Sequence, residues 1–241
     1  GRKSIIPSLF LKKNSKKKII NIHIQHPKIA LKYFDFVVCP EHDNLEGPNV
    51  LRTKGAIHYL THEEINNSKD YLLNKLEKNK DVITLILGGP NKYYNYSDKN
   101  MINIFSIINR MLKEYNLHLL VIPSNRTPKK TIEFCKEYFT YNRTIVDTVD
   151  KSAYLSSLYL AKYIVVTCDS TSMISEAALT GKPVYVAMIP ALRNDIRFQR
   201  FRNLFEKLNI IKKLENKLET WNYEKLNEAD RIATEIKGKI Q

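Results

Sequence analysis

The feature that most constrains the fold is a regular alternation of short apolar runs and helix-compatible stretches between residues 81 and 186. Continuously apolar strands separated by helices are typical of a parallel sheet that is covered on both faces. The sequence therefore predicts an α/β fold, in which ligands bind outside the carboxyl ends of the strands. We expect strands over residues 82–87, 117–122, 144–147, 164–166 and 184–186.

Polar turns follow four of these strands, and they carry groups that suit a phosphate. They read GGPN (88–91), PSNRT (123–127), DTVDK (147–151) and TCDSTS (167–172). In the last turn Ser170, Thr171 and Ser172 stand at the start of a predicted helix, where free N–H groups and the helix dipole favour an anion. The alternative is that one hydroxyl only caps the helix. Because the carboxyl ends of parallel strands share one edge, we expect all four turns to line one rim.

Further residues of this region suit a nucleotide. Arg126 is suited to bidentate phosphate binding, and Gly88 with Gly89 allows close backbone approach to a ligand. The alternatives are a surface arginine and an ordinary turn. Glu176 lies one helical turn beyond Ser172, away from the predicted packing face, so we expect it to accept hydrogen bonds from ribose hydroxyls unless it is merely solvated. The glycines lack the spacing of a dinucleotide fingerprint and of a Walker loop.

The first part of the chain is less regular. We expect a helix beginning in GRKSIIPSLFLKK, strands over residues 18–24 and 34–39, and then a turn-rich segment, 40–58, that excludes a long regular element. In this segment either His42 or Asp43 can act as a general base, or each can serve only in loop hydrogen bonding or capping. Since no strand precedes the first turn, we expect the start of this lobe to be missing.

Two further segments join and follow these regions. Thr61 and Glu64 have the spacing of a capping box, which predicts a polar helix running to about residue 79 between two lobes. Beyond residue 186, a basic stretch at 193–202 leads into a helix, and a final helix ends near residue 239.

The net charge of +14 comes mainly from lysines scattered through the chain. The run KKNSKKK, residues 12–18, is denser and suits phosphates or lipid headgroups, although such a run is commonly a solvated loop. We expect no nucleic-acid partner. The three cysteines lack paired spacing, which indicates a reducing compartment without a disulfide framework or zinc site.

Several long segments resemble one protein family. They are VVCPEHDNLEGPNVLRTKGAIH, LILGGPNKYYNYS, LLVIPSNRTPK, VVTCDSTSMISEAALTGKPVYV, RFQRF, LETWNY and LNEAD. These segments are similar to the family of the plant mitochondrial fission protein called elongated mitochondria and its bacterial relatives, which are assigned to glycosyl transfer. The resemblance covers nearly the whole chain. It implies a glycosyltransferase B-type architecture of two Rossmann-like lobes, with a truncated N-terminal lobe.

The resemblance also implies roles for the two lobes and their residues. Residues 1–78 would form the acceptor-side lobe, with a helix at 223–241 crossing back to it, and residues 79–222 the donor-binding lobe. His42 and Asp43 become acceptor-side candidates, and Gly1 and Arg2 would approach the cleft. The donor-side candidates are Gly88, Gly89, Asn91, Ser124, Asn125, Arg126, Ser170, Thr171, Ser172 and Glu176.

We therefore expect a metal-independent transferase without a cofactor, which moves a sugar from a nucleoside diphosphate donor to a cell-envelope-type acceptor. The alternative is a catalytically silent adaptor of the same fold that sits on an anionic membrane surface and recruits partners. The basic segments at 12–18 and 193–202 motivate this alternative. Either protein would be cytoplasmic, and the adaptor would be peripheral on the membrane.

Overall fold

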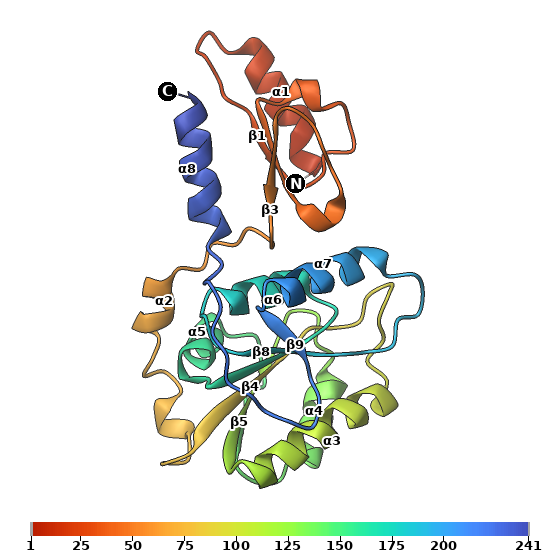
Figure 1. Cartoon of the computed structure of the whole chain (residues 1–241), viewed down its shortest axis with the longest axis vertical. Helices are drawn as coiled ribbons and strands as arrows, with labels where there is room; N and C mark the ends of the chain where they lie inside the picture. Colours follow the sequence, from red (N-terminus) through yellow and green to blue (C-terminus); the bar gives the residue numbers. More distant parts are fainter. Residues whose placement is uncertain (1, 241) are drawn as a thin grey trace. The chain divides into compact units, whose positions relative to one another are not determined.

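The computed structural model describes residues 2–240 (Figure 1). The chain divides into two compact units, a smaller one of Gly1–His58 with Asn227–Gln241 and a larger one of Tyr59–Leu226. These boundaries differ from the expected ones at residues 78 and 222. The capped helix after Thr61 belongs to the larger unit because Leu60 and Ile65 are buried in the core of that unit.

The larger unit is built on a six-stranded parallel sheet with the strand order β6-β5-β4-β7-β8-β9. The five predicted strands are confirmed. The sixth, β9, was not predicted, because two of its three residues are lysines and it forms no apolar run in the sequence. The strands are β4 (Asp81–Leu87), β5 (Leu117–Pro123), β6 (Arg143–Ile145), β7 (Tyr163–Thr167), β8 (Val184–Ala187) and β9 (Ile211–Lys213).

The strand order reverses between β4 and β7. From β4 the chain adds β5 and β6 on one side, and it then returns to add β7, β8 and β9 on the other. In open α/β sheets, such a reversal leaves a crevice at the carboxyl ends of the two central strands, where ligands bind. The turns after β4 and β7 therefore hold the most favourable position on this sheet.

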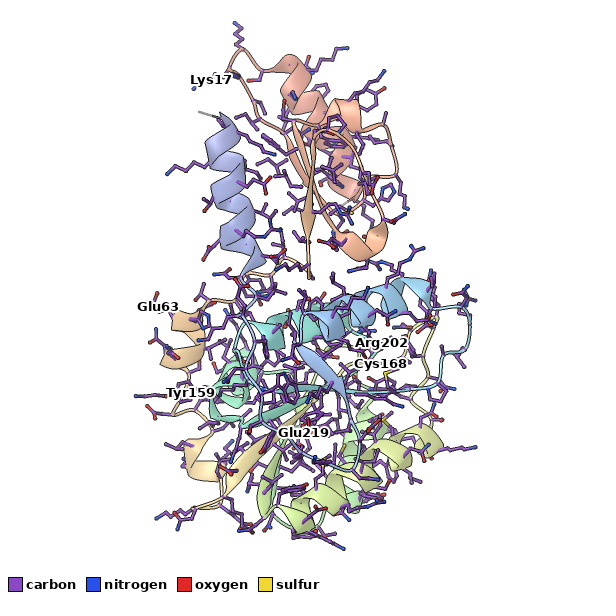
Figure 2. The ribbon with its side chains drawn as sticks, in the orientation of Figure 1. Lys17, Glu63, Tyr159, Cys168, Arg202 and Glu219 are labelled. Carbon is purple, nitrogen blue, oxygen red and sulfur yellow. The ribbon has the colours of Figure 1, made fainter. Side chains whose placement is uncertain are left out.

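Four helices of the larger unit begin at a capping residue or a proline, whereas the helix expected after the basic stretch at 193–202 begins within it, at Ile196. Hydrogen bonds from the first turn to Ser97, Asp150 and Ser170 cap three of them, and another begins directly after Pro128. The helices are α3 (Asp98–Glu114), α4 (Lys129–Tyr138), α5 (Lys151–Leu160), α6 (Thr171–Ala178) and α7 (Ile196–Lys207). The core lies between them and the sheet, and it encloses the buried side chains of Cys168 and Arg202 (Figure 2).

The capping box at Thr61 and Glu64 is confirmed, but the length predicted for its helix is wrong. Helix α2 (His62–Asn67) ends early, and a separate 3-10 turn, η4 (Leu73–Lys75), follows. The side chain of Ser68 donates to the carbonyl of Glu64 at 3.0 Å, so it occupies an acceptor of the last helical turn. Asparagine and serine compete with helical backbone bonds in this way.

The smaller unit is a three-stranded parallel sheet in the order β1-β2-β3. Its strands are β1 (Ile22–Ile24), β2 (Phe36–Pro40) and β3 (Val50–Thr53). Helices α1 (Ile5–Asn14) and α8 (Glu228–Ile240) cover opposite faces (Figure 1). The final helix thus packs with the first part of the chain, and the turn-rich segment contains one short strand that was not predicted, β3. No helix among residues 2–240 is long and apolar enough to cross a membrane.

Candidate functional site

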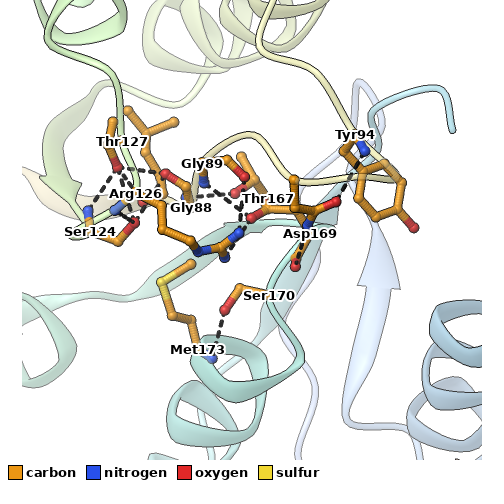
Figure 3. A network of polar contacts seen from close by, with 12 residues as sticks. Gly88, Gly89, Tyr94, Ser124, Arg126, Thr127, Thr167, Asp169, Ser170 and Met173 are labelled. Carbon is orange, nitrogen blue, oxygen red and sulfur yellow. Dashed lines mark hydrogen bonds and ion pairs between the residues drawn. The ribbon is translucent and has the colours of Figure 1, made fainter. Parts of the chain in front are cut away.

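The carboxylate of Asp169 joins the turns that follow β4, β5 and β7 (Figure 3). It accepts hydrogen bonds from the backbone N–H of Gly89 at 3.0 Å and from the Nη2 atom of Arg126 at 2.8 Å. The hydroxyl of Tyr96 donates to it at 2.6 Å. Its side chain has no exposed surface. A buried carboxylate is stable only with such partners, so Asp169 holds the three turns together.

Neither Asp169 nor Tyr96 was among the predicted site residues. Burial raises the pKa of Tyr96, so its hydroxyl remains a donor, and this hydroxyl also lies 2.8 Å from Oγ1 of Thr167. The acid directly after an apolar strand was the available signal for Asp169. Tyr96 stands in a polar tyrosine-rich segment that carries no comparable signal.

Gly88 and Gly89 are needed for contact between the turns themselves. A Cβ atom on Gly88 would lie 2.2 Å from Oδ2 of Asp169, and one on Gly89 would lie 2.0 Å from the carbonyl oxygen of Arg126. Both glycines are buried. We expected the missing side chains of these glycines to leave room for a ligand. Neighbouring turns fill that room instead.

Arg126 is the basic group that this network presents. Its Nη1 atom donates to the carbonyl of Gly89 at 3.1 Å, while Nη2 is held by Asp169. The side chain nevertheless keeps 43% of its surface exposed. A guanidinium held by two partners loses little further side-chain freedom on binding an anion, which favours a phosphate contact.

Two other residues that were predicted to bind the sugar donor form hydrogen bonds that stabilise the turns. The hydroxyl of Ser124 donates to the carbonyl of Gly88 at 3.0 Å, beside a 2.6 Å bond from Thr127 to the same carbonyl. Asn91 accepts from two backbone N–H groups within its own turn, at 2.8 and 3.1 Å. Asn125, in contrast, is exposed.

The N-terminus of α6 follows Asp169 directly. Ser170 is the capping residue, and its hydroxyl accepts from the N–H of Met173 at 3.4 Å. The capping alternative therefore describes Ser170. Thr171 is half-buried and Ser172 is exposed. The first-turn N–H groups of this helix supply the positive end of its dipole.

Glu176 is paired with a partly buried tyrosine. Its Oε2 atom accepts a 2.5 Å hydrogen bond from the hydroxyl of Tyr154 on α5. Burial raises the pKa of Glu176, although the bond from Tyr154 opposes this shift. Burial also raises the pKa of Tyr154, which keeps that hydroxyl protonated. Glu176 is thus a positioned carboxyl group, and the simple solvated alternative does not hold.

In the smaller unit, His42 and Asp43 form a single 3-10 turn, η3 (Glu41–Asp43), directly after β2. His42 is only 3% exposed, whereas the side chain of Asp43 is 13% exposed. The thiol of Cys39 donates to Oδ2 of Asp43 at 3.7 Å. Of the two predicted bases, Asp43 is the one with accessible surface. Gly1 and the side chain of Arg2 lie outside the described residues.

The fourth turn and the basic stretch have other roles than those predicted. In the turn DTVDK, Asp150 caps α5 and accepts from Tyr71 at 2.6 Å, and Asp147 pairs with Lys136 at 2.6 Å. In the basic stretch, Arg202 is buried and donates to Asp195 at 3.0 Å, so it is not part of a basic surface. Within residues 2–240, no group of three or more His, Cys, Asp and Glu side chains is placed to hold a metal ion.

A family model described as "Mitochondrial fission ELM1" matches residues 1–240 of the chain. An uncharacterized Rickettsia prowazekii protein is 27% identical over 98% of this chain and 77% of its own length. The Arabidopsis thaliana mitochondrial fission protein ELM1 is 23% identical over 100% of this chain and 62% of its own length. The chain therefore spans less than two thirds of the plant relative.

Among solved structures, the UDP-GlcNAc 2-epimerase from Methanocaldococcus jannaschii is similar with a TM-score of 0.51 and 14% identity. The match covers 98% of this chain and 73% of the epimerase chain. At this identity the likeness concerns the fold alone. It confirms the expected glycosyltransferase B-type α/β fold.

Proposed function

This chain belongs to the mitochondrial fission ELM1 family, and we propose that its larger unit binds the diphosphate of a nucleoside diphosphate sugar. One observation carries the proposal. Asp169 joins three turns at the reversal of strand order, and it directly precedes the capping residue of α6. From this position its carboxylate holds the half-exposed Arg126. A fixed cation beside a helix N-terminus is suited to an anion of two phosphate groups.

In this proposal the diphosphate accepts hydrogen bonds from the first-turn N–H groups of α6, from the exposed hydroxyl of Ser172 and from Arg126. The same groups stabilise the negative charge that develops on the diphosphate when the sugar leaves. They supply the positive potential that a metal ion provides at other phosphate sites. Transfer without a metal therefore remains our prediction.

Glu176 would select the ribose of the nucleotide. Its Oε2 atom is held by Tyr154, which fixes the direction of the carboxyl group and leaves Oε1 for ribose hydroxyl donors. The similar epimerase is named for a uridine diphosphate sugar, and this name supports the same class of ligand for this chain. The residues named above contact the diphosphate and the ribose of the nucleotide, and they do not select its base or the transferred sugar.

For the transfer itself we propose that Asp43 removes the proton of the acceptor hydroxyl. It is more accessible than His42, and a carboxylate can act as a general base on a hydroxyl group. We propose a cell-envelope-type acceptor on the basis of the family resemblance alone. Asp43→Asn should then abolish transfer and leave donor binding intact.

Calorimetry with uridine, guanosine, thymidine and cytidine diphosphate sugars tests donor binding. Arg126→Ala should weaken the binding about 10- to 100-fold, because it removes charge-assisted hydrogen bonds of ~1.5–3 kcal/mol. Lys129→Ala, which removes an exposed cation three residues further along, is the matched control and should have little effect. If no sugar nucleotide binds to the unaltered protein, the proposal is wrong.

The family name favours a second candidate, a catalytically silent adaptor of the same fold, since one relative is named a mitochondrial fission protein. The two candidates differ in turnover. Release of nucleoside diphosphate in the presence of lipid-linked or glycan acceptors, with and without a chelator, supports the metal-independent transferase. Donor binding without any turnover supports the adaptor.

A further inference from the structure

Helix α1 has apolar side chains on the side facing the core and also on the side facing away from it. Ile5 is buried and Leu9 packs beside it against Phe34 and Val37. Ile6, Phe10 and Leu11 are 80%, 66% and 62% exposed. Ile6 and Phe10, at positions i and i+4, are neighbours on the helix surface, and Leu11 lies about 100° further round the side that faces away from the core. Three adjacent large apolar side chains at this exposure form a patch that is unusual for a free surface.

The part of the chain that contains this patch is strongly basic. Residues 2–40 contain nine lysines and arginines against one acidic residue, Asp35. Asp35 is already paired with Lys12 at 2.5 Å. Lys13, at the end of α1, is exposed, and so are the lysines at 16–18 in the segment that follows it. Lys17 projects outward from this segment (Figure 2).

The combination of the two features identifies the kind of partner. Lysine is depleted in the centres of protein–protein interfaces. Most contacts to a nucleic acid are made to its charged phosphates, which exposed isoleucine and leucine side chains do not bind. Apolar side chains beside lysines match the boundary between acyl chains and anionic headgroups of a lipid bilayer. The lysine stems also add apolar contact while their ammonium groups stay at the headgroups.

We propose that α1 and the lysines that follow it dock on an anionic lipid bilayer. Ile6, Phe10 and Leu11 insert at the level of the headgroups, and the lysines at 13 and 16–18 contact anionic lipids. This proposal does not depend on donor binding, because every residue that carries it belongs to the smaller unit. The stretch at 193–202, the other basic segment considered, has its Arg202 buried and is not needed.

Flotation of the full chain with vesicles tests the proposal. The vesicles are phosphatidylcholine alone, or phosphatidylcholine with about one third phosphatidylglycerol. The first variant is K16Q/K17Q/K18Q. Its matched control, K99Q/K113Q/K207Q, removes the same charge from exposed lysines of the larger unit. A second variant, I6Q/F10Q, is matched by I102Q/I196Q, which alters exposed isoleucines of the larger unit.

We expect binding to the anionic vesicles only. Each lysine near such a surface contributes about fivefold in affinity, so the triple lysine variant should bind on the order of 100-fold more weakly at low salt. I6Q/F10Q should also bind at least about 10-fold more weakly. Both controls should bind like the unaltered protein, and added salt should weaken binding.

Three results would overturn the proposal. One is no binding to anionic vesicles at low salt. Another is an equal loss in K16Q/K17Q/K18Q and its charge-matched control, which would make net charge the cause. The third is a loss in the lysine variant with none in I6Q/F10Q, which would indicate general polyanion binding. Circular dichroism of each variant checks that the exposed substitutions leave the fold intact.

Discussion

The turns after β4, β5 and β7 in the larger unit and the turn after β2 in the smaller unit both lie at the carboxyl ends of parallel strands, but they are held differently. In the larger unit, a buried carboxylate from one turn accepts from the other two through Gly89 and Arg126. In the smaller unit, Asp43 accepts from Cys39, only four residues away. The bonds to Asp169 thus link turns that follow three strands, whereas the bond from Cys39 lies within the segment that contains Asp43.

The difference indicates how each site would meet a ligand. The turns around Asp169 have their polar groups placed before a ligand arrives, which lowers the entropy cost of binding. At the turn with His42 and Asp43 the contacts are longer, at 3.7 Å from the thiol of Cys39 to Asp43 and 3.9 Å between Glu41 and Arg52 on β3. Fixed donors suit the stabilisation of phosphate charge, while a general base needs only one accessible carboxylate.

The largest expected effect comes from Gly89→Ala. Its Cβ would lie 2.0 Å from a backbone oxygen, so the turns must separate, and we expect a loss of about 3 kcal/mol in the free energy of unfolding. Urea unfolding followed by the fluorescence of Trp221, the single tryptophan, reports on the larger unit.

Gly238→Ala in α8 is the matched glycine of the smaller unit, since nothing lies within 4 Å of its added Cβ. It should raise stability by up to about 1 kcal/mol, measured by circular dichroism. Equal effects of the two substitutions would contradict the close contact assigned to the turns of the larger unit.

Asp169→Asn should have the next largest effect. The amide keeps the shape of the side chain but weakens the bond to Arg126. It also places an N–H donor where Gly89, Tyr96 and Arg126 already donate, so we expect a loss of about 2 kcal/mol in the free energy of unfolding. Donor affinity should fall as well, because Arg126 is no longer held. Urea unfolding and calorimetry measure the two effects.

Asp43→Asn is the matched change in the smaller unit, and it should cost less than about 1 kcal/mol, since the side chain keeps some exposed surface and the thiol of Cys39 is a weak donor at 3.7 Å. A stability loss for Asp43→Asn as large as that for Asp169→Asn would remove the contrast between the two turns.

The smallest expected effect, about 1 kcal/mol near neutral pH, is that of Tyr154→Phe, which removes the hydroxyl bonded to Glu176. Burial raises the pKa of Glu176 in the native state, so the folded protein binds more protons than the unfolded chain above the ordinary glutamate value. Stability therefore falls as the pH rises through this range.

Because the bond from Tyr154 opposes this shift, its removal raises the pKa of Glu176 further. The loss in Tyr154→Phe should thus be greater near pH 7 than near pH 4, as measured by unfolding at each pH. Tyr71→Phe, which removes a similar but solvent-exposed bond to Asp150, is the control and should cost less. A loss for Tyr154→Phe that does not change with pH would contradict the pairing.

The sequence alone located most of the larger unit. Its apolar runs predicted β4 to β8, and Thr61 with Glu64 predicted the start of α2. Its polar turns identified the segments that contain Arg126 and the N-terminus of α6. These features are local, because strand composition, capping and turn chemistry are set within a few residues of the chain.

Only the tertiary structure decided how these segments meet. Asp169 is 73 residues from Tyr96 and 43 from Arg126 in sequence, so their bonds depend on the strand order rather than on any local pattern. The same order turned Gly88 and Gly89 into contacts between turns and paired Glu176 with Tyr154. Residue type predicted phosphate chemistry here, and packing determined which of those side chains are exposed, as Arg126 and Ser172 are, and which hold the turns together.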